Sequence, residues 1–157
     1  MEETSKFTIR VYGIIINGNN EILLSDEFQL GVKMTKLPGG GLEFGEGTID
    51  CLKRELREEC NQQEIKNIRH FYTTDFYQKA LFYKNRQLLS IYYFAELQHP
   101  IQFTVSKKPF DFDNLENGKQ SFRWVQIKNL NEEEITFPID KFVLRKIQNL
   151  FVNNENL

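Results

Sequence analysis

Residues 37–62 read LPGGGLEFGEGTIDCLKRELREECNQ, a glycine-rich turn followed by a segment with helical periodicity. A helix advances by about 100° per residue, so residues three and four apart share a face. Glu55, Glu58 and Glu59 stand in that relation. The stretch therefore predicts a helix that presents three carboxylates along one edge. The turn before it is one in which backbone can approach a ligand closely, because glycine lacks a side chain.

The same segment carries an apolar stripe beside the carboxylates. Ile49, Leu52, Leu56 and Cys60 recur at spacings that suit a face packed on a core. The helix is expected from about Thr48 to Cys60, with Thr48 as its N-cap residue. The three carboxylates then lie at the border between core and solvent.

Three clustered carboxylates repel one another unless a positive charge lies among them. A hard divalent cation removes that conflict, and Mg²⁺ typically binds a few carboxylates together with substrate phosphates. An ordinary solvated acidic helix is the competing interpretation. Glu46 favours a binding site, because it lies eight residues before Arg54 and an ion pair between them would join the turn to the helix.

The segment resembles the Nudix box, Gly-x5-Glu-x7-Arg-Glu-U-x-Glu-Glu-x-Gly-U, in which U is a bulky aliphatic residue. Gly40 and Glu46 match its first glycine and first glutamate. The resemblance implies a Nudix fold, an α+β fold (α/β/α sandwich) with a mixed sheet between helices, over a single domain of residues 1–157. The central run of the box is matched, with correct spacing, by Arg54, Glu55, Leu56, Glu58 and Glu59.

Two positions depart from the box. Asn61 stands where the second glycine belongs, and Gln62 stands where the last aliphatic residue belongs. Position 61 would follow the helix in the left-handed conformation, which Asn tolerates best among the other residues. We therefore expect Asn61→Gly to be tolerated, with at most a slight gain in stability. Ile65 is expected to supply the missing apolar contact.

The resemblance also implies a reaction, hydrolysis of a phosphoanhydride bond with Mg²⁺ or Mn²⁺ as cofactor. Glu58, Glu59 and the Gly39 carbonyl are the expected metal ligands. Glu55 is either the base that activates water or a ligand of a second metal ion.

Four further residues of the box region receive roles by the same resemblance. Arg54 and Glu46 are grouped with the catalytic residues, because they would orient the helix edge; an ordinary surface ion pair is the alternative. Gly40 and Gly41 are expected to contact the substrate.

Other candidates lie downstream. Glu116, in a polar loop, is either an additional metal ligand or a solvated loop acid. The run from Phe137 to Asp140 resembles a segment that lines the nucleotide pocket in some family members, which makes these two residues candidate substrate contacts. Four aromatic residues either stack a base or, more commonly, pack in a core: Phe76, Tyr77, Phe82 and Tyr83.

Composition indicates an ordinary globular chain of 157 residues, with 40% hydrophobic residues, 27% charged residues and a net charge of −2. We expect no stable nucleic-acid complex and no membrane association, because no general positive charge attracts either. The polar start Met1-Glu2-Glu3-Thr4 is unlike a secretory signal. Cys51 and Cys60 are expected to be reduced thiols. We therefore expect a cytoplasmic monomer or homodimer.

The expected activity is that of a Nudix-type pyrophosphohydrolase. Its substrate would be a nucleoside diphosphate linked to another moiety: a nucleoside triphosphate, a nucleotide sugar, ADP-ribose or a dinucleoside polyphosphate. A non-catalytic Nudix-fold nucleotide-binding sensor module is the alternative. The intact set of box carboxylates favours the enzyme.

Hydrophobic patterning and turn residues place the other elements. Strands and a closing helix are expected as follows: strands over residues 8–17, 21–24, 88–97, 101–105 and 121–127, and a helix over residues 140–151.

Overall fold

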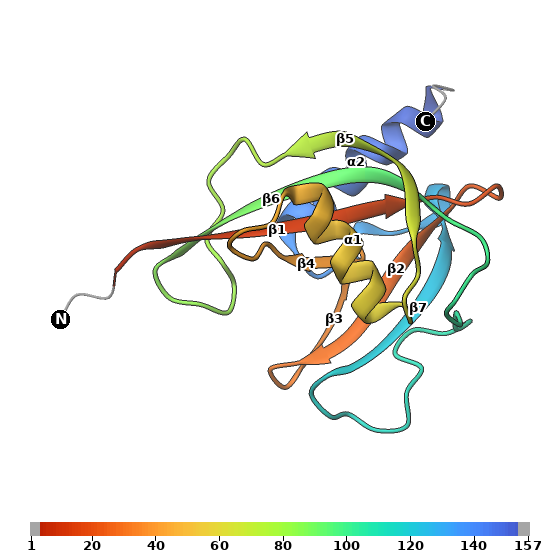
Figure 1. Cartoon of the computed structure of the whole chain (residues 1–157), viewed down its shortest axis with the longest axis horizontal. Helices are drawn as coiled ribbons and strands as arrows, with labels where there is room; N and C mark the ends of the chain where they lie inside the picture. Colours follow the sequence, from red (N-terminus) through yellow and green to blue (C-terminus); the bar gives the residue numbers. More distant parts are fainter. Residues whose placement is uncertain (1–3, 154–157) are drawn as a thin grey trace. The chain divides into compact units, whose positions relative to one another are not determined.

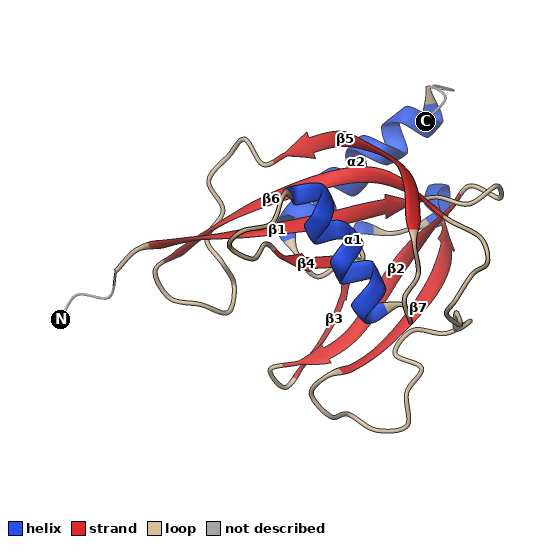
Figure 2. Ribbon diagram, viewed as in Figure 1, coloured by secondary structure: helices blue, strands red, loops and turns tan. Residues whose placement is uncertain are grey.

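The computed structural model describes residues 4–153, so the first three residues of the polar start lie outside it. Its contacts define two compact units. Unit 1 holds residues 4–14 and 39–102, and unit 2 holds residues 15–38 and 103–153. Each unit contains one sheet and one α-helix (Figures 1 and 2). Within residues 4–153, no helix combines the length and apolar character needed to span a membrane.

The sheet of unit 1 has four strands in the order β4-β1-β6-β5. β4 is antiparallel to β1, and β5 is antiparallel to β6. β1 and β6 begin at the same end, where the Lys6 N–H donates to the Asn85 carbonyl at 2.9 Å. These neighbours therefore run in the same direction, and the sheet is mixed. The strands are β1 (Lys6–Ile15), β4 (Gly39–Gly41), β5 (Ile65–Thr73) and β6 (Arg86–Leu97).

The box helix of unit 1, α1 (Thr48–Glu59), packs on β4 and also contacts β5. Leu52, Leu56 and Cys60 are fully buried, as the apolar stripe predicts. Ile49 is 40% exposed, and Cys51 is buried instead. The buried face is therefore shifted at the first turn of the helix. Both cysteines are free, as expected.

The start of α1 differs from the prediction. Gly47 is the N-cap residue, and its N–H donates to Asp50 Oδ2 at 3.3 Å. The predicted cap, Thr48, is the first helical residue, and its hydroxyl pairs with the Tyr93 hydroxyl on β6 at 2.6 Å. The prediction of Thr48 as the N-cap residue is wrong, because its hydroxyl bonds to the sheet rather than to the helix backbone.

Unit 2 has a three-stranded antiparallel sheet in the order β3-β2-β7. Ile22 and Leu24 of β2 line a small cavity together with Leu144 and Ile147 of α2, so this helix covers one face of the sheet. The elements are β2 (Glu21–Gln29), β3 (Val32–Lys36), β7 (Lys119–Gln126), the short helices η1 (Ile127–Asn129) and η2 (Glu132–Glu134), and α2 (Pro138–Val152).

A buried charged group on β2 was not predicted from the sequence. Asp26 is fully buried. It accepts a hydrogen bond from Arg123 Nε at 2.7 Å and another from the Thr35 hydroxyl at 2.6 Å. Burial of Asp26 in β2 is therefore tolerated, because each oxygen of its carboxylate accepts a hydrogen bond.

The strand predicted over residues 101–105 is wrong, because this segment is irregular. Its backbone bonds to a side chain instead of to a sheet: the Gln102 N–H donates to Gln63 Oε1 at 2.7 Å. The other predicted strands and the closing helix are present with shifted ends.

Candidate active site

The glycine turn brings β4 against β1 more closely than any side chain would allow. Gly39 has φ +141°, and a Cβ there would lie 2.8 Å from Tyr12 Cα and still nearer to the Val11 carbonyl. A Cβ on Gly40 would overlap the carboxyl group of Glu55. Glycine at position 40 is therefore what allows the Glu55 carboxylate to lie against the backbone of the turn.

Arg54 joins the turn to the helix. Its Nε donates to Glu46 Oε2 at 2.9 Å and its Nη2 donates to Glu46 Oε1 at 2.8 Å. Nη2 also donates to the Gly41 carbonyl at 3.0 Å. The ion pair predicted between these two residues is present, and its paired geometry fixes the direction of the guanidinium plane.

The remaining guanidinium nitrogen, Arg54 Nη1, faces the carboxylate edge of α1. It lies 3.1 Å from Glu55 Oε1 and 3.2 Å from Glu58 Oε2. Glu43 of the turn is more distant, at 3.7 Å. The positively charged Arg54 guanidinium therefore lies among the clustered carboxylates and reduces their mutual repulsion.

The ion pair changes the acidities of its members. Hydrogen bonds from Arg54 lower the pKa of Glu46 to about 2, and the same bonds raise the pKa of Arg54 above its ordinary value. Burial raises the pKa of the neighbouring Cys51 thiol to about 12. Cys51 is therefore a neutral thiol at physiological pH, which argues against a nucleophilic role.

The donor set along this edge suits a hard divalent cation. Glu55, Glu58 and Glu59 offer carboxylate oxygens, and the side chains of Glu55 and Glu58 are 13% and 58% exposed. The backbone of the turn, which can offer carbonyl oxygens, lies beside Glu55 because Gly40 has no Cβ. Oxygen donors of both kinds are those that Mg²⁺ prefers. Among residues 4–153, no three acidic, His or Cys side chains already converge as a ligand group.

The exit of α1 is shaped by the two residues that depart from the box. Asn61 and Gln62 have φ of +51° and +65°, so the left-handed conformation predicted at position 61 is present. The Asn61 side chain has a role that the sequence did not indicate: its Nδ2 donates to the Gln102 carbonyl at 2.8 Å. Ile65 is buried, as expected.

Gln63 fastens the same exit from inside the unit. It is fully buried, and its Nε2 donates to the Gln98 carbonyl at 2.7 Å while its Oε1 accepts from the Gln102 N–H. Asn61 and Gln63 thus hold the end of the carboxylate helix to residues 98–102. The sequence around Gln63 did not indicate that its side chain is buried and hydrogen-bonded, because its partners lie about 40 residues further along the chain.

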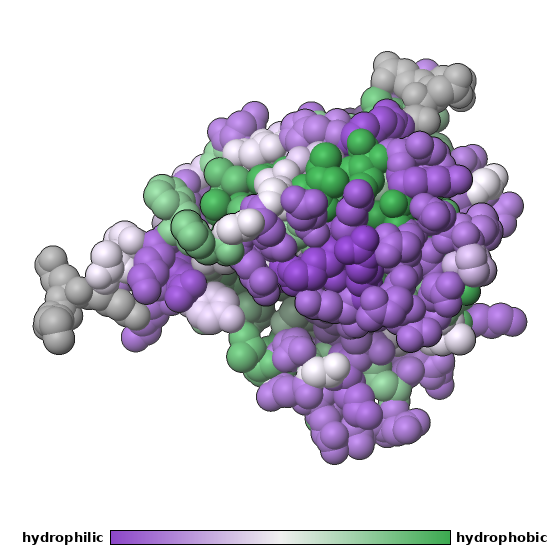
Figure 3. Space-filling view, viewed as in Figure 1, coloured by the Kyte–Doolittle hydropathy of each residue, from purple (hydrophilic) through white to green (hydrophobic). Residues whose placement is uncertain are grey.

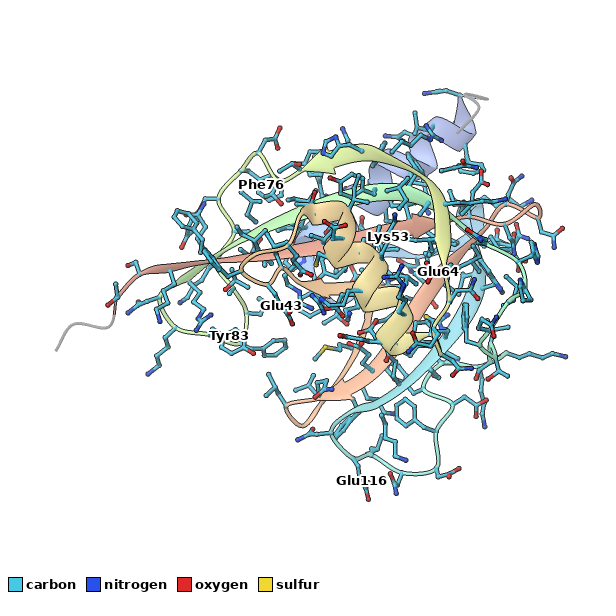
Figure 4. All side chains as sticks on the ribbon, viewed as in Figure 1. Glu43, Lys53, Glu64, Phe76, Tyr83 and Glu116 are labelled. Atoms are coloured by element: carbon cyan, nitrogen blue, oxygen red, sulfur yellow. The ribbon has the colours of Figure 1, made fainter. Side chains whose placement is uncertain are left out.

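The candidates predicted downstream of the box belong to unit 2. Glu116 is exposed on the loop between β6 and β7, where it accepts from Asn114 Nδ2 at 3.2 Å (Figure 4). Phe137 is the N-cap residue of α2. Asp140 is 2% exposed in the first turn of that helix, where the helix dipole favours a negative charge.

The four aromatic residues between β5 and β6 do not pack in a core, so the commoner fate expected for them is wrong. Their exposures are 39% for Phe76, 70% for Tyr77, 39% for Phe82 and 51% for Tyr83. The loop extends the β5–β6 hairpin, and Lys79 forms a β-bridge with Gln87 near the start of β6. Figure 4 labels Phe76 and Tyr83 of this loop.

The model of the NUDIX domain family matches residues 6–145, which include the whole box. The chain belongs to the NUDIX domain family. The prediction of a Nudix-type pyrophosphohydrolase is thereby confirmed at the level of the family.

Solved structures resemble this NUDIX chain over nearly its whole length. A MutT structure, from work on Aliivibrio salmonicida and Vibrio cholerae, has a TM-score of 0.59 and 22% identity, covering 92% of this chain and 99% of that chain. A NUDIX hydrolase from Nitrosomonas europaea has a TM-score of 0.67 and 16% identity, covering 90% of this chain and 88% of that chain. The E. coli ORF135 protein has a TM-score of 0.64 and 18% identity, covering 94% of this chain and 92% of that chain. At these identities the likeness concerns the fold, and the predicted Nudix fold is confirmed.

Proposed function

We propose that this NUDIX chain hydrolyses a phosphoanhydride bond in a nucleoside diphosphate linked to another moiety, with Mg²⁺ or Mn²⁺ as cofactor. The observation that carries the proposal is the contact between Glu55 and Gly40. It places a carboxylate directly against the glycine turn, beside the carboxylate edge of the same helix. Phosphates held at that turn would lie next to both.

Glu58, Glu59 and the Gly39 carbonyl would hold the cation. When bound, a divalent cation neutralises the charge of the phosphates and of the leaving oxygen. Arg54 keeps the edge in place, because its guanidinium is itself fixed by Glu46. Gly40 and Gly41 would contact the phosphate chain through their backbone.

Glu55 has one of two roles in the reaction. As a base, it accepts a proton from the attacking water, whose oxygen forms a bond to phosphorus while the bridging P–O bond breaks. The leaving phosphate then departs as an anion or takes a proton from solvent. As a ligand, Glu55 instead contributes an oxygen to a second cation. In both roles Arg54 Nη1, which donates to Glu55 Oε1 at 3.1 Å, would help to hold the carboxylate in position.

The residues of unit 2 keep their predicted roles as part of the proposal. Glu116 is proposed as an additional metal ligand, supported by its exposed carboxylate. Phe137 and Asp140 are proposed as substrate contacts. The low exposure of Asp140 makes it the weaker of the two.

A nucleotide-type small molecule is the proposed partner, and the cytoplasm is the proposed location. The single domain over residues 1–157 and the state as monomer or homodimer stay predictions. A sensor module would bind the same compounds without turnover.

A substrate screen tests the proposal. Nucleoside triphosphates, nucleotide sugars, ADP-ribose and dinucleoside polyphosphates are incubated with the protein and Mg²⁺ or Mn²⁺, and the phosphorus products are followed by ³¹P NMR. We expect at least one class to be cleaved and the cleavage to stop in excess chelator. Tight nucleotide binding with no cleavage of any class would favour the sensor.

A further inference from the structure

Unit 1 carries exposed apolar side chains at the start of β1, in the glycine turn and in the β5–β6 loop. Phe7 is 71% exposed, Tyr77 70%, Leu81 53% and Tyr83 51%, and Phe44 in the glycine turn is fully exposed. Figure 3 shows hydrophobic surface beside the hydrophilic side chains that cover α1. Such surfaces on soluble proteins commonly mark binding sites. The five residues Phe7, Phe44, Tyr77, Leu81 and Tyr83 are called the aromatic platform below.

The start of β1 connects the parts of the platform. The Lys6 N–H donates to the Asn85 carbonyl at 2.9 Å, which places the tip of the β5–β6 loop beside Phe7. Further along β1, the Leu42 N–H donates to the Ile9 carbonyl at 2.9 Å. The glycine turn that carries the platform residue Phe44 therefore borders the same strand.

The core face of β1 itself runs into the platform. Phe7, Ile9 and Val11 share one face of the strand, because side chains alternate. Their exposures fall from 71% through 36% to zero. The apolar face that is buried at Val11 thus emerges into solvent as it approaches the loop.

The β5–β6 loop of the platform carries positive charge in a chain whose net charge is −2. Residues 76–86 include Lys79, Lys84 and Arg86 and no acidic residue, and Lys6 adjoins them. Arg86 lies over the Tyr83 ring, with its Cζ 5.1 Å from the ring centroid. Aromatic rings interleaved with cations suit a polyanion that also has a flat ring.

The platform is within reach of the glycine turn. Arg10 pairs with Gly41 and lies four positions after Lys6 in β1, which is a distance of about 13 Å along the strand. A nucleoside with a polyphosphate chain spans such a length. Phe44, a residue of the platform, lies within the glycine turn itself, so part of the platform is closer to the turn than this distance.

We propose that the aromatic platform binds the nucleobase of the substrate by stacking, while the phosphates lie at the glycine turn. The inference rests on the proposed function and names its substrate as a base-bearing polyphosphate. A second copy of the chain fits the surface less well, because a two-fold contact would bring its cluster of cations close to the same cluster in the partner.

Equilibrium binding tests the platform separately from hydrolysis. The probes are adenosine and uridine α,β-methylene diphosphates and, as the ligand without a base, methylenediphosphonate, each titrated by calorimetry with Mg²⁺. Tyr83→Ala and Phe44→Ala are compared with Tyr83→Phe, which keeps the ring, and with Val105→Ala, which removes exposed apolar surface elsewhere. Thermal unfolding confirms that each variant is folded.

We expect the two Ala variants at the platform to bind at least one nucleoside analogue about 5- to 150-fold more weakly. Their affinity for methylenediphosphonate should stay unchanged, and Tyr83→Phe and Val105→Ala should resemble the unmodified chain. Equal losses for ligands with and without a base, or no loss for either, would overturn the proposal. So would a dimer that dissociates in Tyr83→Ala while nucleotide affinity stays constant.

The proposed function fails by a different result, the absence of any phosphoanhydride cleavage by the unmodified chain. Selective loss of nucleoside binding would still support the platform in that case.

Discussion

The Arg54 guanidinium and the Glu46 carboxylate face each other through two hydrogen bonds, of 2.9 Å and 2.8 Å. One partner lies in the glycine turn and the other in the middle of α1. The pair therefore fixes the distance between the turn and the carboxylate edge. The remaining nitrogen of the same guanidinium contacts Glu55 and Glu58, so the position of the edge depends on the pair.

Acid weakens this pair within a defined range of pH. The pKa of Glu46 falls from 4.5 to about 2 on folding. Its stabilising contribution is therefore complete above pH 4.5 and is lost as the pH falls towards 2. Glu46→Gln should be less stable than the unmodified chain at neutral pH, and the difference should shrink across that range. Urea unfolding followed by circular dichroism at several pH values measures it.

Glu43→Gln is the control for the acid experiment. Its carboxylate is 68% exposed and lies 3.7 Å from Arg54 Nη1, so its removal should change stability little at any pH. A difference between Glu46→Gln and the unmodified chain that is constant from neutral pH to pH 2 would contradict the assigned acidity.

The hydrogen bond from Asn61 to Gln102 changes what is expected of position 61. Glycine relieves the positive φ but loses the bond, so Asn61→Gly should alter the free energy of unfolding by less than about 1 kcal/mol. Asn61→Ala loses the bond and keeps an unfavourable φ, which should cost about 1–3 kcal/mol. Urea unfolding ranks the three proteins. Equal stability of the Ala and Gly variants would show that the left-handed conformation is not retained.

The box helix could be predicted because its information is local. The spacing of Glu55, Glu58 and Glu59 follows from helical periodicity, and the pairing of Arg54 with Glu46 spans only eight residues. The downstream strand over residues 88–97 could likewise be predicted from its alternating pattern.

Features that depend on distant partners were not predictable. Ile101 and Val105 look like strand residues but are 43% and 45% exposed, because the backbone between them bonds to Gln63. Core packing is the commoner fate of aromatic side chains such as Tyr77 and Tyr83, whereas in the structure they are 70% and 51% exposed. Burial of Asp26 could be inferred only with Arg123 in view, almost 100 residues away.

Removal of the Asp26 charge should be costly. Asp26→Asn leaves Arg123 buried, at 9% side-chain exposure, without its counter-ion. The expected loss is about 3–5 kcal/mol in the free energy of unfolding. The exposed pair between Glu132 and Arg145, at 2.7 Å in the same unit, provides a matched control. Glu132→Gln should cost at most about 1 kcal/mol. Similar losses in both variants, measured by urea unfolding, would contradict the importance of the buried pair.

Glu55→Gln separates its two proposed roles. Turnover should fall by about 100-fold or more in either role, because the carboxylate that contacts the turn loses its charge. If Glu55 is the base, calorimetric affinity for a metal–nucleotide analogue should change little; if it is a ligand, affinity should fall with turnover. Full activity in a folded variant would contradict both roles.

The central claim is that the carboxylate edge of α1 supports metal-dependent hydrolysis. The most direct measurement compares single-turnover rates, with saturating Mg²⁺, of Glu58→Gln and Glu59→Gln with that of Glu64→Gln. Glu64 follows the helix and pairs with Arg57 at 2.7 Å, so its variant makes the same chemical change away from the edge. We expect the rate to fall by about 100-fold or more in the first two variants, with their folds intact, and to be nearly normal in the third. Near-normal rates in all three would show that the carboxylate edge does not take part in the reaction.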